Sequence, residues 1–173
     1  MSETPSPQRR RFFSTLLSSD HTAPNGAPWH RVPEVNATDG DVLWSGLVIN
    51  NTLMVVGDEG MVLRYNGETD SNGRLWQPME VPAQLPLHGI WGLTEDNIFA
   101  VGWMGTLLHY DGVQWSSLRG GVIDQRTERF AACEENTPLF AIDGNAQGQA
   151  WAVGDDGLIL HFDGQHWQRE ASS

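Results

Sequence analysis

The stretch Ile98–Trp115 reads IFAVGWMGTLLHYDGVQW, and it decides the fold. An apolar run ends at Gly102, Gly105 follows three positions later, and a second apolar run leads through an aromatic residue to Gly112. Glycines at such spacings mark tight turns, whereas short apolar runs between them are typical of β-strands. The stretch therefore predicts two strands joined by a tight turn, a second turn, and a further strand at Trp115.

The same pattern occurs twice more, in Leu53–Trp76 (LMVVGDEGMVLRYNGETDSNGRLW) and in Ala150–Trp167 (AWAVGDDGLILHFDGQHW). The first glycine recurs after 45 residues (57 to 102) and after 52 (102 to 154), close to the period of about 40–50 residues of propeller blades. Two insertions account for the extra length: Glu68–Arg74 predicts a longer hairpin loop, and Gly120–Pro138 precedes the third copy. Each copy follows another short apolar run, so each unit has four strand candidates. These runs are Val42-Leu43-Trp44, Gly89-Ile90-Trp91 and Leu139-Phe140-Ala141.

Side chains two residues apart point to the same side of a strand. The runs MVV, FAV and WAV, apolar at successive positions before a glycine, predict a strand that neighbouring blades bury on both faces. Trp44, Trp91 and Phe140 read as equivalent positions upstream, which predicts that they belong to the core. His109 and His161 share one repeat position in different copies, so we interpret them as structural strand residues rather than metal ligands.

We expect an all-β fold of three four-stranded propeller-type blades, a partial or oligomer-completed β-propeller, with a short N-terminal helical extension. The expected propeller-repeat domain is 29–173, with blades at about 42–81, 87–119 and 139–170 and an insertion at 120–138. Closed propellers have about four to eight blades. Three blades therefore need a second chain, another protein, or an irregular fourth element built by the insertion. The strand around Trp29 has no blade of its own.

The repeats resemble the bacterial BNR-like propeller repeats of photosystem II assembly and stability factor-like proteins, in which W-G…D-V-[FW]-A-V-G-x-x-G-x-[IL]-L-H-[YF]-D-G-x-x-W recurs. Trp91-Gly92 through Trp115 matches this sequence best, and the resemblance covers about residues 29–170. The resemblance implies a propeller and makes an assembly-factor or accessory-subunit role an expectation. The Asp-box of sialidases, Ser-x-Asp-x-Gly-x-x-Trp, does not occur in the chain, which disfavours the enzymatic relatives.

Composition excludes several classes of function. The 173 residues carry 22 Asp and Glu against 10 Lys and Arg, a formal charge of −12, which disfavours nucleic acid as a partner because phosphate binding needs clustered cations. One cysteine, Cys133, excludes an internal disulfide and multi-cysteine metal sites. No run approaches the roughly 20 apolar residues of a membrane span. We expect no metal site and no cofactor.

Residues 1–28 form an N-terminal extension outside the repeats, with a candidate docking helix at 7–17. Arginines followed by two phenylalanines resemble the twin-arginine export motif, but the apolar run after them is shorter than the roughly 7–15 residues of a signal. We therefore expect a cytoplasmic protein, or one on the cytoplasmic face of a membrane complex. The segment either binds a partner protein or an anionic membrane surface, or it is a solvated tail. The expected partner-binding residues are Arg9, Arg10, Arg11, Phe12, Phe13, Leu16, Leu17 and Trp29.

These observations favour a non-catalytic protein-interaction or scaffold subunit, docking on a larger complex through its open blade edge and N-terminal hook, or associating with itself. Trp103, which stands where the other copies have Asp58 and Asp155, is a candidate rim contact, as is His88. The alternatives are a carbohydrate-binding propeller lectin and, less favoured, a glycoside hydrolase. A hydrolase needs two convergent carboxylates, and nothing in the sequence shows convergence.

Overall fold

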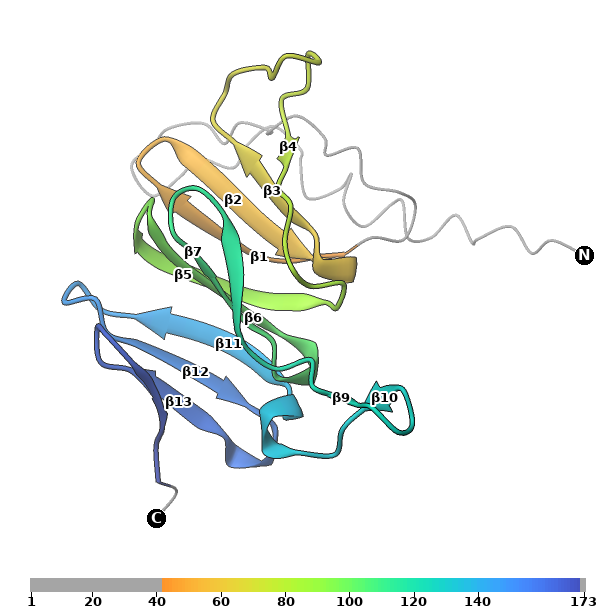
Figure 1. Cartoon of the computed structure of the whole chain (residues 1–173). Helices are drawn as coiled ribbons and strands as arrows, with labels where there is room; N and C mark the ends of the chain where they lie inside the picture. The colour runs from red at the N-terminus through yellow and green to blue at the C-terminus, as the bar shows by residue number, and fades with distance from the viewer. Residues whose placement is uncertain (1–41, 172–173) are drawn as a thin grey trace, which may run out of the picture. The chain divides into compact units, whose positions relative to one another are not determined.

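The computed structural model describes residues 42–171. Its strands form three antiparallel four-stranded sheets and one two-stranded hairpin (Figure 1). Within each large sheet the strands lie in the order of the sequence, which is the arrangement of a propeller blade. The structure thus confirms the all-β class and the three blades. The N-terminal extension and its candidate helix lie outside the described residues. No helix between residues 42 and 171 is long and apolar enough to cross a bilayer.

The blades correspond to the three copies of the repeat. The first blade consists of β1 (Leu43–Ile49), β2 (Thr52–Gly57), β3 (Val62–Tyr65) and β4 (Gln77–Pro78). The second consists of β5 (Leu87–Thr94), β6 (Asn97–Gly102), β7 (Leu107–Tyr110) and β8 (Trp115–Arg119). The third consists of β11 (Leu139–Gly144), β12 (Ala150–Gly154), β13 (Ile159–Phe162) and β14 (Trp167–Arg169). Single 3₁₀ turns join the second and third strands of each blade: η1 (Asp58–Gly60), η2 (Trp103–Gly105) and η4 (Asp155–Gly157).

The 3₁₀ turn explains why two glycines recur in every copy. A Cβ on Gly102 would collide with the carbonyl oxygen of Pro86, and the Trp103 N–H donates to that same oxygen at 2.9 Å. Gly105 has φ +67°, in the left-handed region where a side chain is unfavourable. The first glycine therefore lets the turn lie directly against the start of the first strand of the blade, and the second closes the turn.

Two apolar cores hold the blades together. The first strands β1, β5 and β11 contact one another in turn, so they are the innermost strands of the stack. Between the first two blades the core includes Met54, Val56 and Val62 on one side and Ile98 and Leu108 on the other. An equivalent core lies between the second and third blades. It includes Phe99, Val101 and Leu107 facing Ala152, Leu160 and Phe162.

Burial of the central strands departs from the prediction in the third blade. MVV of β2 and FAV of β6 are buried throughout, as predicted. In the WAV run of β12 Ala152 is buried, while Trp151 and Val153 are 37% and 43% exposed. The prediction was wrong for these two residues, because no further blade follows among residues 42–171 to cover that face.

The upstream register also differs from the prediction. Leu43, Leu87 and Leu139 each pair with the first glycine of the turn, so the equivalent residues that follow them are Trp44, His88 and Phe140, not Trp91. A β-bulge directly after this position shifts the pairing in all three blades. Trp91 is buried, whereas Trp44 and Phe140 are 52% and 47% exposed. Their assignment to the core was wrong, since each is the extra residue of a bulge and has no partner in the strand register.

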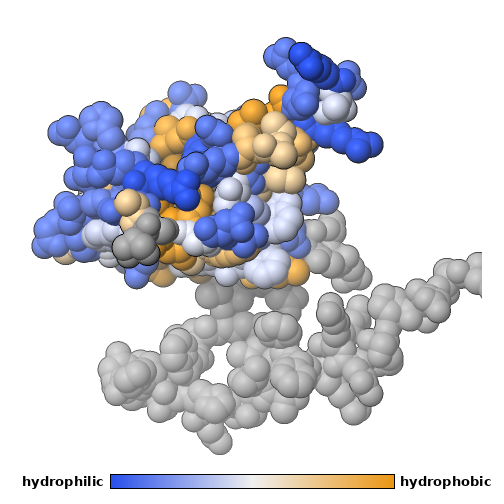
Figure 2. Space-filling model, turned by 90° about the horizontal axis from the view of Figure 1, so that it is seen from below, coloured by the Kyte–Doolittle hydropathy of each residue, from blue (hydrophilic) through white to orange (hydrophobic). Residues whose placement is uncertain are grey.

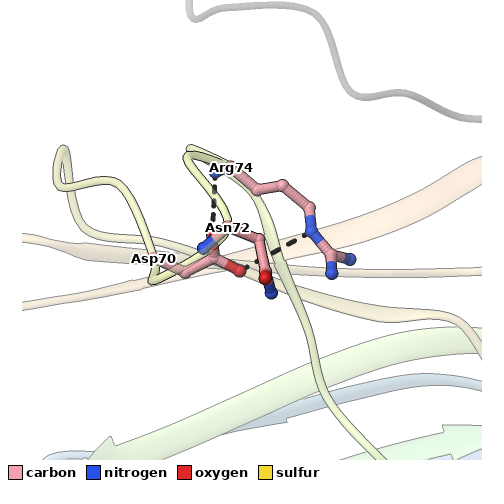
Figure 3. Close-up of polar contacts among 3 residues, drawn as sticks. All are labelled: Asp70, Asn72 and Arg74. Atoms are coloured by element: carbon pink, nitrogen blue, oxygen red, sulfur yellow. Dashed lines mark hydrogen bonds and ion pairs between the residues drawn. The ribbon is translucent and has the colours of Figure 1, made fainter.

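The long hairpin loop predicted in the first copy is confirmed between β3 and β4. The Asp70 carboxylate accepts hydrogen bonds from the N–H groups of Asn72 and Arg74, both at 2.8 Å, and pairs with the Arg74 guanidinium at 3.6 Å (Figure 3). The backbone hydrogen bond from Arg74 is the main cause that lowers the pKa of Asp70. Local hydrogen bonds thus order this insertion without any contribution from a core.

The insertion at 120–138 forms a small hairpin, β9 (Ile123–Asp124) and β10 (Arg129–Phe130), followed by η3 (Glu134–Asn136). Buried Asn136 closes it: the side chain accepts from the Val122 N–H and donates to the carbonyl oxygens of Val122 and Ala131, all at 2.7–2.8 Å. The two inter-blade cores contain no residue of this insertion. It is therefore a hairpin attached to the blades and does not build a fourth one.

Candidate functional site

Four ring side chains from all three blades meet at the starts of the innermost strands. His88 stands in the centre, with ring centroids 5.4 Å from Trp44, 6.3 Å from Trp103 and 5.9 Å from Phe140. The contacts with both tryptophans are edge-to-face, a favourable geometry for aromatic pairs. We call Trp44, His88, Trp103 and Phe140 the inner-strand aromatic cluster.

Two repeat positions supply the cluster. Trp44, His88 and Phe140 are the bulge residues of β1, β5 and β11, and Trp103 is the first residue of η2. The His88 ring is oriented by the neighbouring blade, because its Nδ1 lies 3.0 Å from the carbonyl oxygen of Leu139. A carbonyl can only accept, so Nδ1 carries the hydrogen and donates it.

The cluster is open to solvent and flanked by acids. Trp44, Trp103 and Phe140 are each 43–52% exposed, which is high for large rings that already touch one another. The Asp58 carboxylate accepts from the indole N–H of Trp44 at 2.7 Å and from the Val42 N–H at 3.1 Å. Asp155 holds the corresponding place in the third blade. Negative charge thus lies beside the exposed rings.

The arrangement of the aromatic cluster and its flanking acids is suited to binding a ligand. Exposed rings beside carboxylates suit apolar side chains and cations, which are attracted to the ring faces. A general acid needs a raised pKa, whereas in the described part of the chain the carboxyl groups with a shifted pKa are shifted downward, chiefly by backbone hydrogen bonds. These are Asp70, Asp111, Glu135 and Asp163. Within residues 42–171, no cluster of three or more His, Cys, Asp or Glu side chains is arranged to hold a metal ion.

A cavity of about 380 Å³ lies between the first and second blades. Leu47 and Met54 line it together with Ile98 and Tyr110, and Arg64 and two acids add polar groups. At the next interface, the positions of Leu47 and Met54 are taken by the larger rings of Trp91 and Phe99. The cavity is therefore the volume that smaller side chains leave in a repeated interface.

The sequence identified half of the cluster. The structure brings the two predicted rim residues, His88 and Trp103, together, and adds Trp44 and Phe140, which were misread as core. Their signal was present, since all three first strands carry a ring at one place, but the prediction aligned Trp91 with them instead of His88. The predicted partner-binding residues Arg9, Arg10, Arg11, Phe12, Phe13, Leu16, Leu17 and Trp29 lie outside the described residues.

The two repeat histidines and the cysteine lie away from the cluster. His109 Nε2 lies 3.0 Å from Asn97 Oδ1, and His161 Nδ1 lies 3.0 Å from a Glu170 oxygen. Cys133 is a half-buried free thiol. These contacts agree with a structural role for both histidines.

The sheets and their register define a protein of the β-propeller type. A scan against protein-family models finds no match, and neither does a search of curated proteins. Among solved structures, the chain is similar to one described as "YCF48 bound to D1 peptide", with a TM-score of 0.51 and 16% sequence identity. The match covers 80% of this chain and 46% of that one. This chain thus has the fold of about half of the longer propeller.

Proposed function

We propose that this chain is a non-catalytic protein-interaction module, an accessory or scaffold subunit that binds a segment of a partner protein on the inner-strand aromatic cluster. The observation that carries the proposal is the cluster itself: rings from three blades within 5.4–6.3 Å of His88, three of them 43–52% exposed. Exposed aromatic residues that are already oriented by neighbours make efficient binding surfaces, because little side-chain entropy is lost on binding.

Charge indicates the chemistry of the partner segment. The chain carries a formal charge of −12, and Asp58 lies directly beside Trp44. An extended segment with Lys or Arg next to apolar or aromatic residues would satisfy both the carboxylates and the ring faces. The structurally similar YCF48 has been solved with a peptide of another protein, which supports a peptide ligand for this type of fold.

The N-terminal segment Arg9–Leu17 is part of the proposal as a second contact with the larger complex. A location in the cytoplasm, or on the cytoplasmic face of a membrane complex, belongs to the proposal as well. Deleting residues 1–20 should weaken binding to that complex while leaving binding at the aromatic cluster unchanged. Loss of both would contradict two separate contacts.

The test uses short fluorescent peptides that pair Arg or Glu with Phe, and fluorescence anisotropy with the full chain. We expect the Arg–Phe peptides to bind and the Glu–Phe peptides to bind at least tenfold more weakly. Trp103→Ala should weaken binding by about tenfold or more, as at other aromatic hot spots. Phe130→Ala is the matched control, since that ring is 38% exposed on the β9–β10 hairpin, away from the cluster.

Two results would overturn the proposal. Equal binding of both peptide types would remove the role of the acids, and unchanged binding by Trp103→Ala would remove the role of the cluster. A glycan array serves as the parallel measurement: glycan binding that depends on Trp103, without peptide binding, would support the propeller-lectin alternative instead.

A further inference from the structure

The cavity of about 380 Å³ between the first and second blades has an apolar floor. Met54 from the first blade and Ile98 and Tyr110 from the second line it, and all three residues are at most 8% exposed. The volume of the cavity lies within the range of roughly 300–1,000 Å³ that is usual for small-molecule sites. The floor is therefore suited to the apolar part of a small ligand.

Charged side chains of both signs line the same cavity. Arg64, on β3 opposite Met54, is half-buried, whereas Glu95 and Asp96 are exposed in the turn between β5 and β6. Within residues 42–171 the Arg64 guanidinium takes part in no hydrogen bond and no ion pair, although it carries five N–H donors. Of the two acids, Glu95 already accepts from the Asn50 side chain at 2.8 Å. Opposite charges thus face the cavity without pairing with each other.

The other blades show that this unpaired arginine is exceptional for its place in the repeat. The same register position holds His109 in the second blade and His161 in the third. His109 Nε2 lies 3.0 Å from Asn97 Oδ1, and His161 Nδ1 lies 3.0 Å from a Glu170 oxygen. Both histidines thus have polar partners within the chain, whereas the guanidinium of Arg64 has none among the described residues. Arg64 is therefore available to a ligand.

The two acids are equally specific to this pair of blades. In the third blade the turn that corresponds to Glu95-Asp96 consists of residues 145–149, which include no charged residue. The face of the third blade that corresponds to the cavity wall is apolar, with Trp151 37% and Val153 43% exposed. Figure 2 views the molecule from below Figure 1, the side on which β11–β13 lie, and shows hydrophobic residues bordered by hydrophilic ones. The repeat therefore does not account for an arginine and two acids around the cavity.

We infer that this cavity binds a small zwitterion with an apolar body, of the class of apolar amino acids and their dipeptides. The carboxylate of the ligand accepts from the Arg64 guanidinium, whose planar fork matches a carboxylate. The ammonium group of the ligand pairs with Asp96 and Glu95, and its apolar side chain contacts the floor of the cavity. Amino acids and dipeptides share this chemistry and differ in the distance between their two charges.

The cavity is separate from the inner-strand aromatic cluster. Trp44 lies at the start of β1, whereas Leu47 and Ile49, which line the cavity, lie toward its end. Five residues of a strand span on the order of 15 Å. The inference therefore does not depend on the proposed function, and Trp103→Ala should leave binding in the cavity unchanged.

The test is isothermal titration calorimetry of the full chain with leucine, phenylalanine and the dipeptide leucyl-leucine. We expect binding, and the comparison of the amino acids with the dipeptide shows which separation of charges fits. The same compounds with an acetylated amino group or an amidated carboxylate should bind at least tenfold more weakly, because each loses one charge pair. Glycyl-glycine, which lacks the apolar body, should also bind at least tenfold more weakly.

Variants of the chain locate the ligand. Arg64→Met removes the charge but keeps an apolar side chain, so it should weaken binding of the zwitterion at least tenfold. It should not change binding of the amidated compound, which has no carboxylate for Arg64. Arg126→Met is the matched control, at an exposed arginine in the turn between β9 and β10. Met54→Phe places a ring in the floor and should abolish binding in a chain that stays folded, which circular dichroism verifies.

Four results would overturn the inference. The first is that none of the zwitterions binds to the full chain. The second is equal binding of the charged and the blocked compounds, because the charges would then have no role. The third is binding that persists in Arg64→Met or in Met54→Phe, since the ligand would then lie elsewhere. The fourth is loss of binding in Trp103→Ala, which would place the ligand at the aromatic cluster.

Discussion

Phe99 and Trp151 occupy the same place in the repeat, but they should differ widely in what they contribute to stability. Phe99 is 2% exposed and Trp151 is 37% exposed. Phe99→Ala removes a ring that packs on Phe162 at 4.9 Å and on Trp167 at 5.3 Å. Such a loss in a core costs about 3–5 kcal/mol. Trp151→Ala removes only the stack on His161 and partly exposed area, and should cost about 1 kcal/mol or less in the single chain.

The assay is urea unfolding followed by far-ultraviolet circular dichroism, which does not depend on the tryptophan that one variant removes. A loss of 3–5 kcal/mol in the free energy of unfolding would also lower the Tm, measured by thermal unfolding, by roughly 6–20 °C for a chain of this size.

Equal costs for the two variants would refute the reasoning. They would mean that the following blade contributes nothing to the burial of Phe99, or that the face of Trp151 is covered in the single chain. A cost of less than 1 kcal/mol for Phe99→Ala would contradict the inter-blade core itself.

Two further predictions concern the cavity and the turns. Met54→Phe gives the first blade the residue type that the second blade has at Phe99. It should stabilise the chain by about 0.5–2 kcal/mol, because the ring fills part of the 380 Å³ cavity. A lower urea midpoint would show that the cavity does not accept the ring. Backbone hydrogen bonds from His166 and Gln165 lower the pKa of Asp163, so its contribution to stability is present above the unfolded pKa of about 3.9 and is lost as pH falls through the folded value. Asp163→Asn keeps an acceptor but loses the charge, so it should slightly lower the midpoint at pH 7 and reduce the decline of the midpoint below about pH 4. An unaltered acid decline would contradict this.

The repeat made most of the fold predictable. Glycine spacing and apolar runs fixed the two central strands and the turn of each blade, because positive φ and close backbone approach restrict those positions to glycine. The loop at Glu68–Arg74 followed from its Gly, Asn, Asp and Ser content. The insertion at 120–138 was located, but its hairpin depends on the side chain of Asn136, which bonds backbone groups 5 and 14 residues away. Composition does not reveal such a contact.

The candidate site was predictable only in part. Trp103 was found because it departs from the other copies of the repeat, and His88 because it lies in the run that enters the second blade. Trp44 and Phe140 were missed because they were aligned with buried Trp91, whereas the bulge makes His88 their equivalent. The exposure of Trp151 was missed because burial depends on whether a neighbouring blade exists, and WAV has the same local sequence signal as FAV.

The bulge at the start of each innermost strand separates two kinds of position. Of the residues after it, Leu47, Ile90 and Ile142 pack in the inter-blade cores, while the bulge residue itself, at 44, 88 or 140, belongs to the aromatic cluster. A change of ring at 44 or 140 alters what the surface contacts and leaves those core residues as they are, whereas His88 also bonds the next blade at the Leu139 carbonyl oxygen. The surface of the repeat can therefore change by single substitutions at 44 and 140 without a compensating change in the core.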